Sequence, residues 1–489
     1  MLQGTGSDVG KSTLVAALAR IARRRGLTVA PFKPQNMSNN AAACETGGEI
    51  GRAQALQAMA AGLRPEVDFN PVLLKPQTDR TSQVVVHGHP VSTREAAAYM
   101  RERGALLRPV MESFQRLIAK YELVIVEGAG SPAEINLREG DIANMGFARH
   151  AQVPVCIVAD IERGGVIASL VGTKAVLEPD DAALIKGFIV NKFRGDPTLF
   201  DSGIEAIERR TGWRSYGVVP WLPATARLPA EDAVSLIPTA EDTRPQLTIV
   251  APMLSRMANF DDADPLSQQE GVQFDWVKPG QPIPRSADVV ILFGTKSTLG
   301  DLKFLREQGW DHDILAHAHR GGRVLGICGG FQMLGHEIHD PDGVDGPAGR
   351  VDGLGLLDVA TTMRRQKTVQ PVNGRDVTSD TPVTGYEIHA GETVGPDCRR
   401  AMFVLHARPD GARSLDGRVS GTYVHGMFAS DVFRERWLVE AGARRLTSFN
   451  YRANVESALN NVADHVERVL DVETLFSEAA TPSTKAFEA

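Results

Sequence analysis

The feature that most constrains this chain lies at its start, where residues 4–13 read GTGSDVGKST. Three glycines, Gly4, Gly6 and Gly10, allow the backbone to wrap closely around an anion without side-chain collisions. A lysine and a serine follow, and then a stretch with helical apolar spacing. A glycine-rich turn between a strand and the N-terminus of a helix is typical of a phosphate-binding loop. The loop therefore predicts an α/β fold for the N-terminal half.

The same segment supplies candidate ligands for a nucleotide and its metal ion. Lys11 is placed to reach the β- and γ-phosphates of ATP, and the Ser12 hydroxyl is placed to ligate Mg²⁺. Lys33 and Asn191 end later apolar runs, and we expect Asn191 to contact the adenine base. The predicted ATP-binding residues are Gly6, Gly10, Lys11, Ser12, Thr13, Lys33 and Asn191.

Four short apolar runs follow in the first half, at 27–33, 123–130, 154–160 and 185–192. Nearly continuous apolar runs are typical of strands buried on both faces of a parallel sheet. The segments between them are long enough for crossover helices, so we predict a doubly wound α/β domain. Only Met1–Gln3 precede the phosphate loop, which predicts that the natural chain starts further upstream.

Charged residues end three of these runs. Ligands in open α/β sheets bind at the carboxyl ends of the strands. Lys33, Glu127 and Asp160 are therefore expected to meet beside the phosphate loop, where a nucleotide and an acidic substrate would come together. The predicted Mg²⁺ ligands are Ser12, Glu127 and Asp160.

The composition changes around 222–246, a segment rich in Pro, Ala, Glu and Thr without periodicity. Apolar runs at 247–254, 288–294 and 323–329 then predict a second α/β unit. Residues 340–420 are richer in Gly, Asp and Thr, which favours loops and antiparallel strands. The predicted division is an N-terminal domain over 1–230, a linker over 231–246, a second domain over 247–445, and a C-terminal helix and tail over 446–489.

A second chemical signal is GRVLGICGGFQMLG at 322–335. A β-run enters Cys328, glycines follow and a helix departs, which exposes a nucleophile in a strained turn. The first turn of a helix also favours a thiolate. The Gly-x-Cys-x-Gly-x-Gln spacing resembles the class I glutamine amidotransferases. The predicted oxyanion and glutamine-binding residues are Gly294, Gly329 and Gln332.

A cysteine nucleophile needs a base, and His425 in GTYVHGMF is the catalytic candidate because a β-run delivers it beside a glycine. Class I amidotransferases normally carry a glutamate two residues after this histidine, but Met427 stands there. We expect a backbone carbonyl or a side chain from 385–392 to orient the ring instead. On this interpretation, Met427→Glu raises glutaminase activity or leaves it unchanged. Three further histidines lie on a predicted surface helix and are not candidates: His312, His317 and His319.

The two halves together resemble one family. Five residues between Gly4 and Gly10 are typical of the dethiobiotin synthetase branch of phosphate-loop enzymes, which activate carboxylates. Joined to an amidotransferase domain without the glutamate, this is similar to the cobyric acid synthase and cobyrinic acid a,c-diamide synthase family. The resemblance covers nearly the whole chain and rests on GTGSDVGKST, PFKPQNMSNN, VEGAGSPAEINL, VADIERGGVIASLVGT, GICGGFQMLG, GYEIHAG and GTYVHGMF.

The resemblance implies an ATP-dependent synthetase domain followed by a glutaminase domain. It implies amidation of the b, d, e and g carboxylates of adenosylcobyrinic acid a,c-diamide, using ATP, Mg²⁺ and glutamine, through an acyl phosphate. The corrinoid is then a substrate, and no bound redox cofactor is expected. The residues implied to bind the corrinoid are Asn36, Ser38, Asn39 and Gln77.

Three alternatives stay open. The sister enzyme that amidates the a and c carboxylates uses the same two domains, although PQNMSNN at 34–40 and GSPAEINL favour the later enzyme by resemblance. A ParA/MinD-like ATPase switch usually carries an additional lysine early in its phosphate loop, and Gly4–Gly6 offers none. A binding module that had lost catalysis would lack the nucleophile, but Cys328 is present.

Composition limits the other classes of function. A chain of 489 residues is too long for one core. Its net charge of −7 offers no support for a nucleic-acid partner. Four scattered cysteines without a CxxC pair, and the lack of a leader-like segment or a long apolar run, predict a reduced cytoplasmic protein off the membrane. We expect an enzyme acting on small molecules, with homo-oligomerisation left open.

Overall fold

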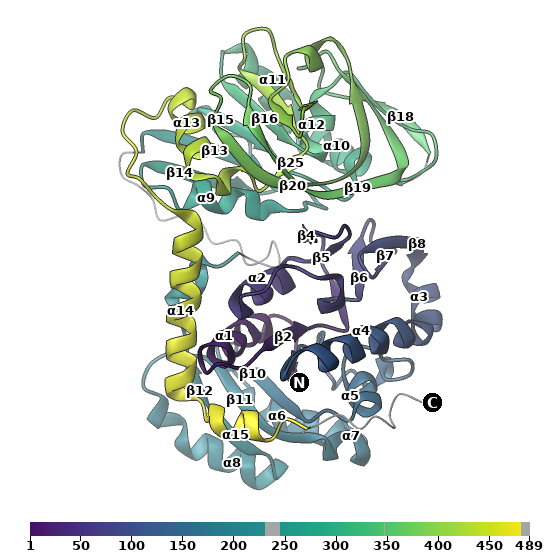
Figure 1. The fold of residues 1–489 in the computed structure, drawn as a ribbon, viewed down its shortest axis with the longest axis vertical. Helices are drawn as coiled ribbons and strands as arrows, with labels where there is room; N and C mark the ends of the chain where they lie inside the picture. Colours follow the sequence, from purple (N-terminus) through teal and green to yellow (C-terminus); the bar gives the residue numbers. More distant parts are fainter. Residues whose placement is uncertain (230–244, 347, 481–489) are drawn as a thin grey trace.

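The computed structural model describes residues 1–229, 245–346 and 348–480. The predicted linker, 231–246, lies almost entirely outside the described residues. The two halves of the chain lie one above the other, and a long helix near the C-terminus runs along the side of the lower half (Figure 1).

A parallel sheet forms the centre of the N-terminal half. Four strands pair in the order β1-β10-β11-β12, and β2 pairs with β9. A parallel bridge between Leu2 and Glu127 joins the two pieces edge to edge. The strands are β1 (Leu2–Gly4), β2 (Val29–Phe32), β9 (Leu123–Val126), β10 (Val155–Asp160), β11 (Ile185–Phe193) and β12 (Arg214–Pro220). The doubly wound parallel sheet predicted from the apolar runs is confirmed.

Helices bury both faces of this sheet. One face shares a core with α4, α5, α6 and α8, including the packed rings of Phe32, Phe114 and Phe147. The other face shares a core with α1, the helix that follows the phosphate loop. The helices of this half are α1 (Lys11–Arg24), α2 (Arg52–Ala61), α3 (Ala96–Glu102), α4 (Leu107–Lys120), α5 (Met145–Ala151), α6 (Val166–Val176), α7 (Pro179–Ala183) and α8 (Asp201–Thr211).

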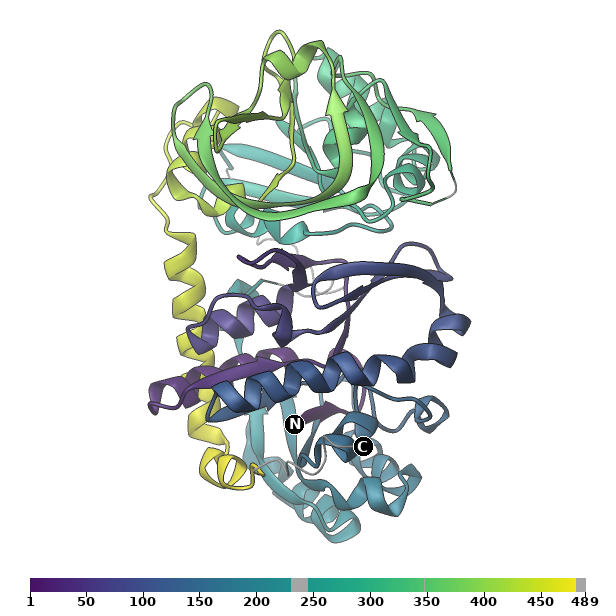
Figure 2. The same ribbon diagram turned by 45° about the vertical axis from the view of Figure 1, so that its right-hand side comes forward.

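Two small sheets rise from this half towards the other, which Figures 1 and 2 show from two sides. One has the order β3-β6-β7-β8, and the other is the β4-β5 hairpin. Their strands are β3 (Gln35–Met37), β4 (Ala41–Ala43), β5 (Glu49–Gly51), β6 (Val72–Pro76), β7 (Thr81–Val86) and β8 (His89–Glu95). Both sheets bring the segment after Lys33 close to the C-terminal half.

The C-terminal half contains a second parallel sheet, of order β14-β13-β15-β16-β24-β23, in which only β23 runs antiparallel. Its strands are β13 (Leu247–Pro252), β14 (Val272–Val277), β15 (Val289–Leu292), β16 (Arg323–Ile327), β23 (Ala412–Arg413) and β24 (Val419–Thr422). The helices are α9 (Asp264–Ser267), α10 (Thr298–Glu307), α11 (Trp310–His319), α12 (Gly329–Leu334) and α13 (Asp431–Ala441).

A largely antiparallel sheet faces the N-terminal half, as expected for 340–420. Its main path is β18-β17-β19-β20-β25, with β21 attached to β19 and β22 attached to β21. The strands are β17 (Glu337–Asp340), β18 (Gly349–Asp352), β19 (Ala360–Asp376), β20 (Pro382–Val394), β21 (Phe403–Leu405), β22 (Arg408–Asp410) and β25 (Val424–His425). Ile388 on β20 packs against apolar residues of the N-terminal half, so this sheet forms part of the contact between the halves.

One prediction about α11 is wrong in part. We expected its histidines to lie at the surface, but His317 is buried and its Nε2 lies 3.1 Å from the carbonyl oxygen of Arg323. Burial lowers the pKa of His317, so the ring is favoured in its neutral form. His317 is therefore a core histidine whose ring contacts the backbone of Arg323.

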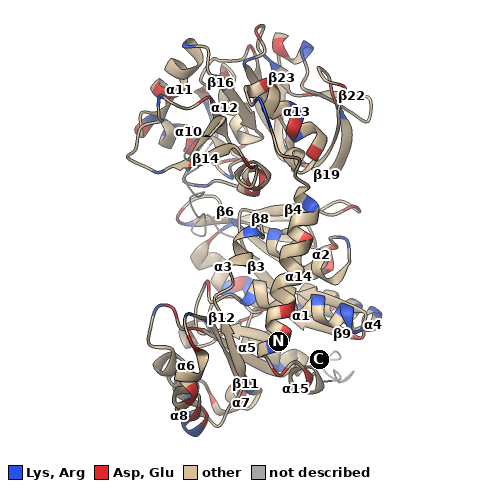
Figure 3. Ribbon diagram, turned by 90° about the vertical axis from the view of Figure 1, so that its left-hand side faces the viewer, with Lys and Arg blue, Asp and Glu red and all other residues tan. Residues whose placement is uncertain are grey.

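The C-terminal segment forms two helices, α14 (Tyr451–Val469) and α15 (Val472–Ser477), where the sequence predicted one. The chain extends between them at Leu470, which bridges to Gly217 of β12. The apolar face of α14 belongs to the core around α1 and not to the C-terminal half's own core. Figure 3 shows α1 and α14 side by side. Ion pairs from α1 and the residue after it to α14 flank this contact: Arg20–Glu456, Arg24–Asp464 and Arg25–Glu467.

Two predictions from composition can also be compared with the structure. All four cysteines are free thiols: Cys44, Cys156, Cys328 and Cys398. Of the helices in the described part of the chain, none has the length and apolar character needed to cross a bilayer.

Candidate active sites

The phosphate loop turns sharply between β1 and α1. Gly10 has a φ of 91°, and a Cβ at this position would lie 2.3 Å from the amide nitrogen of Asn191. That amide donates a hydrogen bond of 2.8 Å to the carbonyl oxygen of Val9. Glycine is therefore required here both for its conformation and for the close approach of Asn191. In this structure, the predicted adenine contact Asn191 supports the loop backbone.

Lys11 folds back over the loop that precedes it. Its ammonium group donates to the carbonyl oxygens of Gly6, at 3.0 Å, and Gly130, at 3.2 Å. The predicted phosphate ligand therefore lies between the loop and the segment after β9, and it lines a cavity together with Gly10, Ser12 and Thr13.

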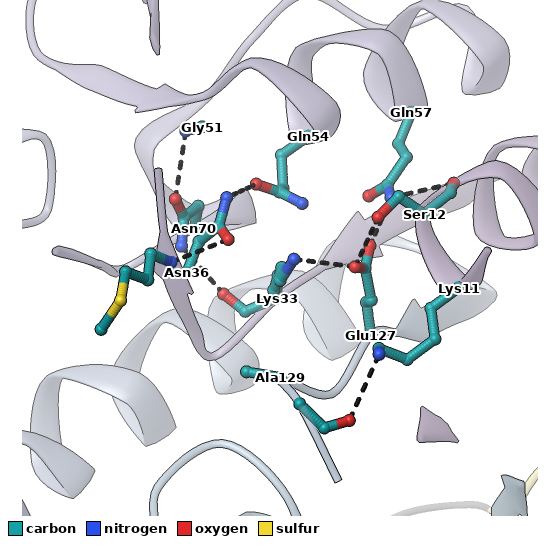
Figure 4. A network of polar contacts seen from close by, with 12 residues as sticks. Lys11, Ser12, Lys33, Asn36, Gly51, Gln54, Gln57, Asn70, Glu127 and Ala129 are labelled. Atoms are coloured by element: carbon teal, nitrogen blue, oxygen red, sulfur yellow. Dashed lines mark hydrogen bonds and ion pairs between the residues drawn. The ribbon is translucent and has the colours of Figure 1, made fainter. Parts of the chain in front are cut away.

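Glu127 is the centre of a buried polar network, which Figure 4 shows from close by. Its side chain is 1% exposed. One carboxylate oxygen accepts hydrogen bonds from the Ser12 hydroxyl and the Lys33 ammonium, both at 2.8 Å. The other accepts from the Gln57 amide at 2.6 Å. The structure thus brings together two predicted Mg²⁺ ligands, Ser12 and Glu127, with the predicted phosphate-binding Lys33.

Asp160 makes a different set of contacts. Its carboxylate pairs with the Lys192 ammonium at 3.2 Å and accepts a hydrogen bond of 2.7 Å from the backbone N–H of Glu162. The hydroxyl of Ser12 and the carboxylate of Glu127 are hard oxygen ligands of the kind that Mg²⁺ prefers. Ser12 and Glu127 therefore fit a magnesium ion, whereas the carboxylate of Asp160 is paired with Lys192.

A cavity of about 1020 Å³ opens beside this network. This is at the upper end of the range for ligand pockets, so it has room for a substrate larger than a nucleotide. Of the predicted corrinoid contacts, Asn36 lines the cavity and its amide donates to Gln54 at 2.9 Å. Ser38 instead accepts from the backbone N–H of Asn40, and Gln77 donates to the carbonyl oxygen of Val344 in the other half. Asn39 has a buried side-chain oxygen without a partner within the described residues.

The nucleophile elbow has the predicted form. Cys328 stands between β16 and α12 with a φ of 54° and a ψ of −110°, a strained backbone for a non-glycine residue. A Cβ on Gly330 would lie 2.0 Å from the carbonyl oxygen of Leu292, so this neighbour must be glycine. The Cys328 thiol lies 3.5 Å from the carbonyl oxygen of Ile388 on β20.

His425 interacts with both Asp262 and Cys328, which makes the three residues a candidate triad. The Nδ1 of His425 donates to Asp262 Oδ2 at 2.7 Å, and the backbone N–H of Gly426 donates to the other oxygen at 2.5 Å. Both side chains are 2% exposed or less. Burial lowers the pKa of His425, but the Asp262 carboxylate and hydrogen bonding with Asp262 and Cys328 outweigh it and raise this pKa to about 10. An imidazolium beside a thiolate is the activated form of a cysteine nucleophile.

Asp262 corrects the expectation for what orients this ring. The hydrogen bond comes from neither a backbone carbonyl nor the 385–392 segment. Tyr386 from that segment does stack on the imidazole, with ring centroids 5.4 Å apart. Met427, at the position of the usual glutamate, is fully buried in the apolar core.

The sequence carried a signal for Asp262 that we did not use. The segment ANFDDADP at 258–265 places three aspartates just after the apolar run 247–254. Polar groups at strand ends also predicted Lys33 and Glu127, and the same argument applies here. His425 lacks the usual glutamate, and this segment offers several carboxylates after a strand. The two observations together could have predicted that one of these aspartates contacts His425.

The predicted oxyanion residues lie around the elbow. A Cβ on Gly294 would be 3.0 Å from the Cε1 of His425, and one on Gly329 would be 3.1 Å from the backbone nitrogen of Thr295. The amide of Gln332 accepts from Thr298 at 3.0 Å and donates to Tyr423 at 3.2 Å. These contacts fix Gln332 beside a second cavity of about 810 Å³, whose lining includes the cationic residues Arg364, Arg365 and Arg408.

Both halves of the chain match known protein families. Residues 1–236 match the CobQ/CobB/MinD/ParA nucleotide binding domain, and 248–433 match the CobB/CobQ-like glutamine amidotransferase domain. Cobyric acid synthase of Hyphomonas neptunium is 63% identical over 486 residues, 99% of this chain and 97% of that protein. Those of Cereibacter sphaeroides (strain ATCC 17025) and Paracoccus denitrificans are 60% and 58% identical, each over 98% of this chain and 99% of the relative. Among solved structures, PurLQS from Thermotoga maritima covers 44% of this chain and all but 2% of its own, with a TM-score of 0.30 and 16% identity, too distant to support a conclusion. The chain belongs to the cobyric acid synthase family of glutamine-dependent amidating enzymes.

Proposed function

We propose that this chain converts adenosylcobyrinic acid a,c-diamide to adenosylcobyric acid in cobalamin biosynthesis, by amidating the b, d, e and g carboxylates. The reaction uses ATP, Mg²⁺ and glutamine and takes place in the cytoplasm. The observation that carries the proposal is that one chain holds two complete centres, a buried Cys328–His425–Asp262 triad and a phosphate loop with Glu127 behind it. Relatives about 60% identical over nearly their whole length are named cobyric acid synthase.

The N-terminal site activates the carboxylate. A carboxylate is a poor electrophile, so its oxygen first attacks the γ-phosphorus of ATP, forming an acyl phosphate and releasing ADP. Lys11 and Lys33 neutralise charge on the phosphates during this step. Ser12 and Glu127 are the residues that would hold Mg²⁺, which supplies further charge neutralisation when bound.

The C-terminal site releases ammonia from glutamine. The thiolate of Cys328 attacks the amide carbon, and the backbone N–H of Gly329 stabilises the developing oxyanion. His425 gives its proton to the leaving nitrogen, so ammonia departs and a thioester remains. A water molecule, deprotonated by His425, then hydrolyses the thioester to glutamate. Asp262 keeps the ring oriented and stabilises its charged form.

Ammonia completes the reaction in the N-terminal site. Its nitrogen attacks the acyl carbon, the phosphate leaves with the bonding electrons, and an amide is formed. Each carboxylate amidated therefore consumes one ATP and one glutamine and yields ADP, phosphate and glutamate.

The test combines the purified protein with Mg-ATP, glutamine labelled with ¹⁵N at the amide, and separate corrinoids. We expect mass spectrometry to show stepwise incorporation of label into the a,c-diamide until four positions carry it. Incorporation only at the a and c positions of the unamidated corrinoid would identify the sister enzyme instead. ATP hydrolysis without labelled corrinoid would favour an ATPase switch.

A further inference from the structure

The loop that carries Asp262 is attached to the N-terminal half. Asn259 has a left-handed backbone with a φ of 54°, and its N–H donates to the side-chain oxygen of Asn40 at 2.6 Å. In return, the backbone N–H of Ala41 donates to the side-chain oxygen of Asn259 at 3.0 Å. Both asparagines are almost fully buried. Buried reciprocal hydrogen bonds of this kind fix the loop relative to the β4 strand of the other half.

A buried ion pair adds a second attachment at the next residues. The Nε of Arg52 lies 2.8 Å from the Oδ2 of Asp261, whose side chain is 4% exposed. Burial raises the pKa of Asp261, so its charged form depends on the nearby guanidinium. Asp261 is directly followed by Asp262, which binds the ring of His425. Removing Arg52 therefore leaves an uncompensated carboxylate next to the catalytic acid.

Arg52 begins α2, and the same helix holds the nucleotide site. Gln57 donates to Glu127 at 2.6 Å and to the carbonyl oxygen of Ser12 at 3.3 Å. Gln54 accepts from Asn36, which lines the large cavity (Figure 4). Five residues of helix span about 7.5 Å. One short, rigid element thus contacts the phosphate loop through Gln57 and the triad loop through Arg52.

We propose that α2 couples the two active sites, with Arg52 as the positioning residue that places Asp262 against His425. The inference rests on the proposed division of the reaction between two sites. Lys33 and Ser12 both donate hydrogen bonds to Glu127. Phosphates that bind to these two residues compete for the same bonds and so change the position of the Glu127 carboxylate, to which Gln57 is also bonded. A shift of α2 changes the Arg52–Asp261 contact and the orientation of the neighbouring Asp262. Glutamine hydrolysis is then fast only when the nucleotide site is occupied.

The experiment measures glutamate release with and without Mg-ATP, in the absence of corrinoid. In the wild-type protein we expect stimulation of at least ~5-fold, the lower end of ordinary coupling between sites. Arg52→Ala should lower the unstimulated rate and remove the response, while Arg52→Lys should restore part of it. The matched control is Lys367→Met, because Lys367 forms another buried ion pair between the halves, with Glu49, that includes no residue of the triad loop. This control should keep the response.

A second readout separates positioning from general damage. The pH profile of Cys328 alkylation should move to higher pH in Arg52→Ala, since a displaced Asp262 stabilises the imidazolium less. If Arg52→Ala does not fold, Asp261→Asn removes the same charge pair with little change in shape and should give the same two effects. An unchanged response and pH profile in the folded variants, or no response in the wild type, would overturn the coupling. Amidation with ammonium salts tests the proposed function separately. If the wild-type protein lacks this activity, the proposed function is refuted, and the result says nothing about whether α2 couples the two sites.

Discussion

The two active sites are built in opposite ways. The nucleotide site is centred on one continuous loop that carries Lys11 and Ser12; Lys33 and Glu127 reach this loop from two other strands, and the site opens into a large cavity. The glutaminase site takes its three groups from segments far apart in the chain, and its histidine and aspartate are almost fully buried. A site made from a local motif depends mainly on backbone geometry, whereas a site assembled over long distances depends on the packing between its segments. Mutations should therefore separate the two sites in activity and in stability.

The largest effect should come from the nucleophile. Cys328→Ala should abolish glutamine-dependent amidation, because no other group can form the thioester. Amidation with high concentrations of ammonium salts should persist, since the N-terminal site is separate. Both activities are measured by labelled nitrogen in the corrinoid, and loss of both in a folded variant would contradict the division between the sites.

The phosphate loop should behave differently from the nucleophile. Lys11→Ala should remove amidation from glutamine and from ammonium alike, because both nitrogen sources need the acyl phosphate. The thiol of Cys328 should still react with an alkylating reagent, as mass spectrometry would show. Near-normal amidation with ammonium in this variant would mean that ATP binds elsewhere.

The contact between Asp262 and His425 allows a sharper test of the buried site. An aspartate accepts hydrogen bonds from both His425 and Gly426, but the amide of Asp262→Asn has only one acceptor oxygen, so a donor must face a donor. We expect glutaminase turnover to fall by about 10²–10⁴-fold, as when the third member of a hydrolase triad is altered. Ammonium-dependent amidation should be retained. A change of less than threefold, a small fraction of the triad effect, would leave Asp262 without a role in catalysis.

Met427 distinguishes packing from catalysis within the same site. Because Asp262 already contacts His425, we do not expect Met427→Glu to raise glutaminase activity, which was one of the two outcomes that the sequence allowed. An unpaired buried carboxylate should destabilise the protein by on the order of 3–5 kcal/mol. Met427→Leu keeps the apolar volume and should cost less than about 1.5 kcal/mol. Thermal unfolding compares the two, and a stable glutamate variant with faster glutamine hydrolysis would restore the earlier interpretation.

The last test concerns pH-dependent stability. The pKa of His425 is raised from 6.5 to about 10, chiefly by Asp262 against the opposing effect of burial. Its contribution to the free energy of unfolding is therefore fully present below pH 6.5 and is lost as the pH rises through about 10. Denaturant unfolding between these values should show a steeper decline for the wild type than for Asp262→Asn. Parallel declines would mean that Asp262 does not set the charge of the ring.

Sequence patterns predicted the parts of the molecule whose structure depends on residues close together in the chain. The apolar runs gave the parallel strands, and the phosphate loop and cysteine elbow have their expected turns. The contact between Asp262 and His425 could not be read in this way, because it joins residues 163 positions apart. Helical spacing in α14 likewise indicated a buried face without indicating its partner. His317 was misplaced for another reason: the sequence did not show that its face of α11 is buried, although the ring contacts the carbonyl oxygen of Arg323 only six residues further along the chain.

The position of α14 has a consequence for the order in which the protein is made. The core around α1 is closed only by residues near the end of the chain, so the N-terminal fold is discontinuous and the glutaminase half is an insertion within it. As the chain leaves the ribosome, the part of α1 that packs against α14 stays uncovered until the whole inserted half has been synthesised. The glutaminase half can complete its own core first. Although the phosphate loop is translated at the start, its domain is the last to finish folding.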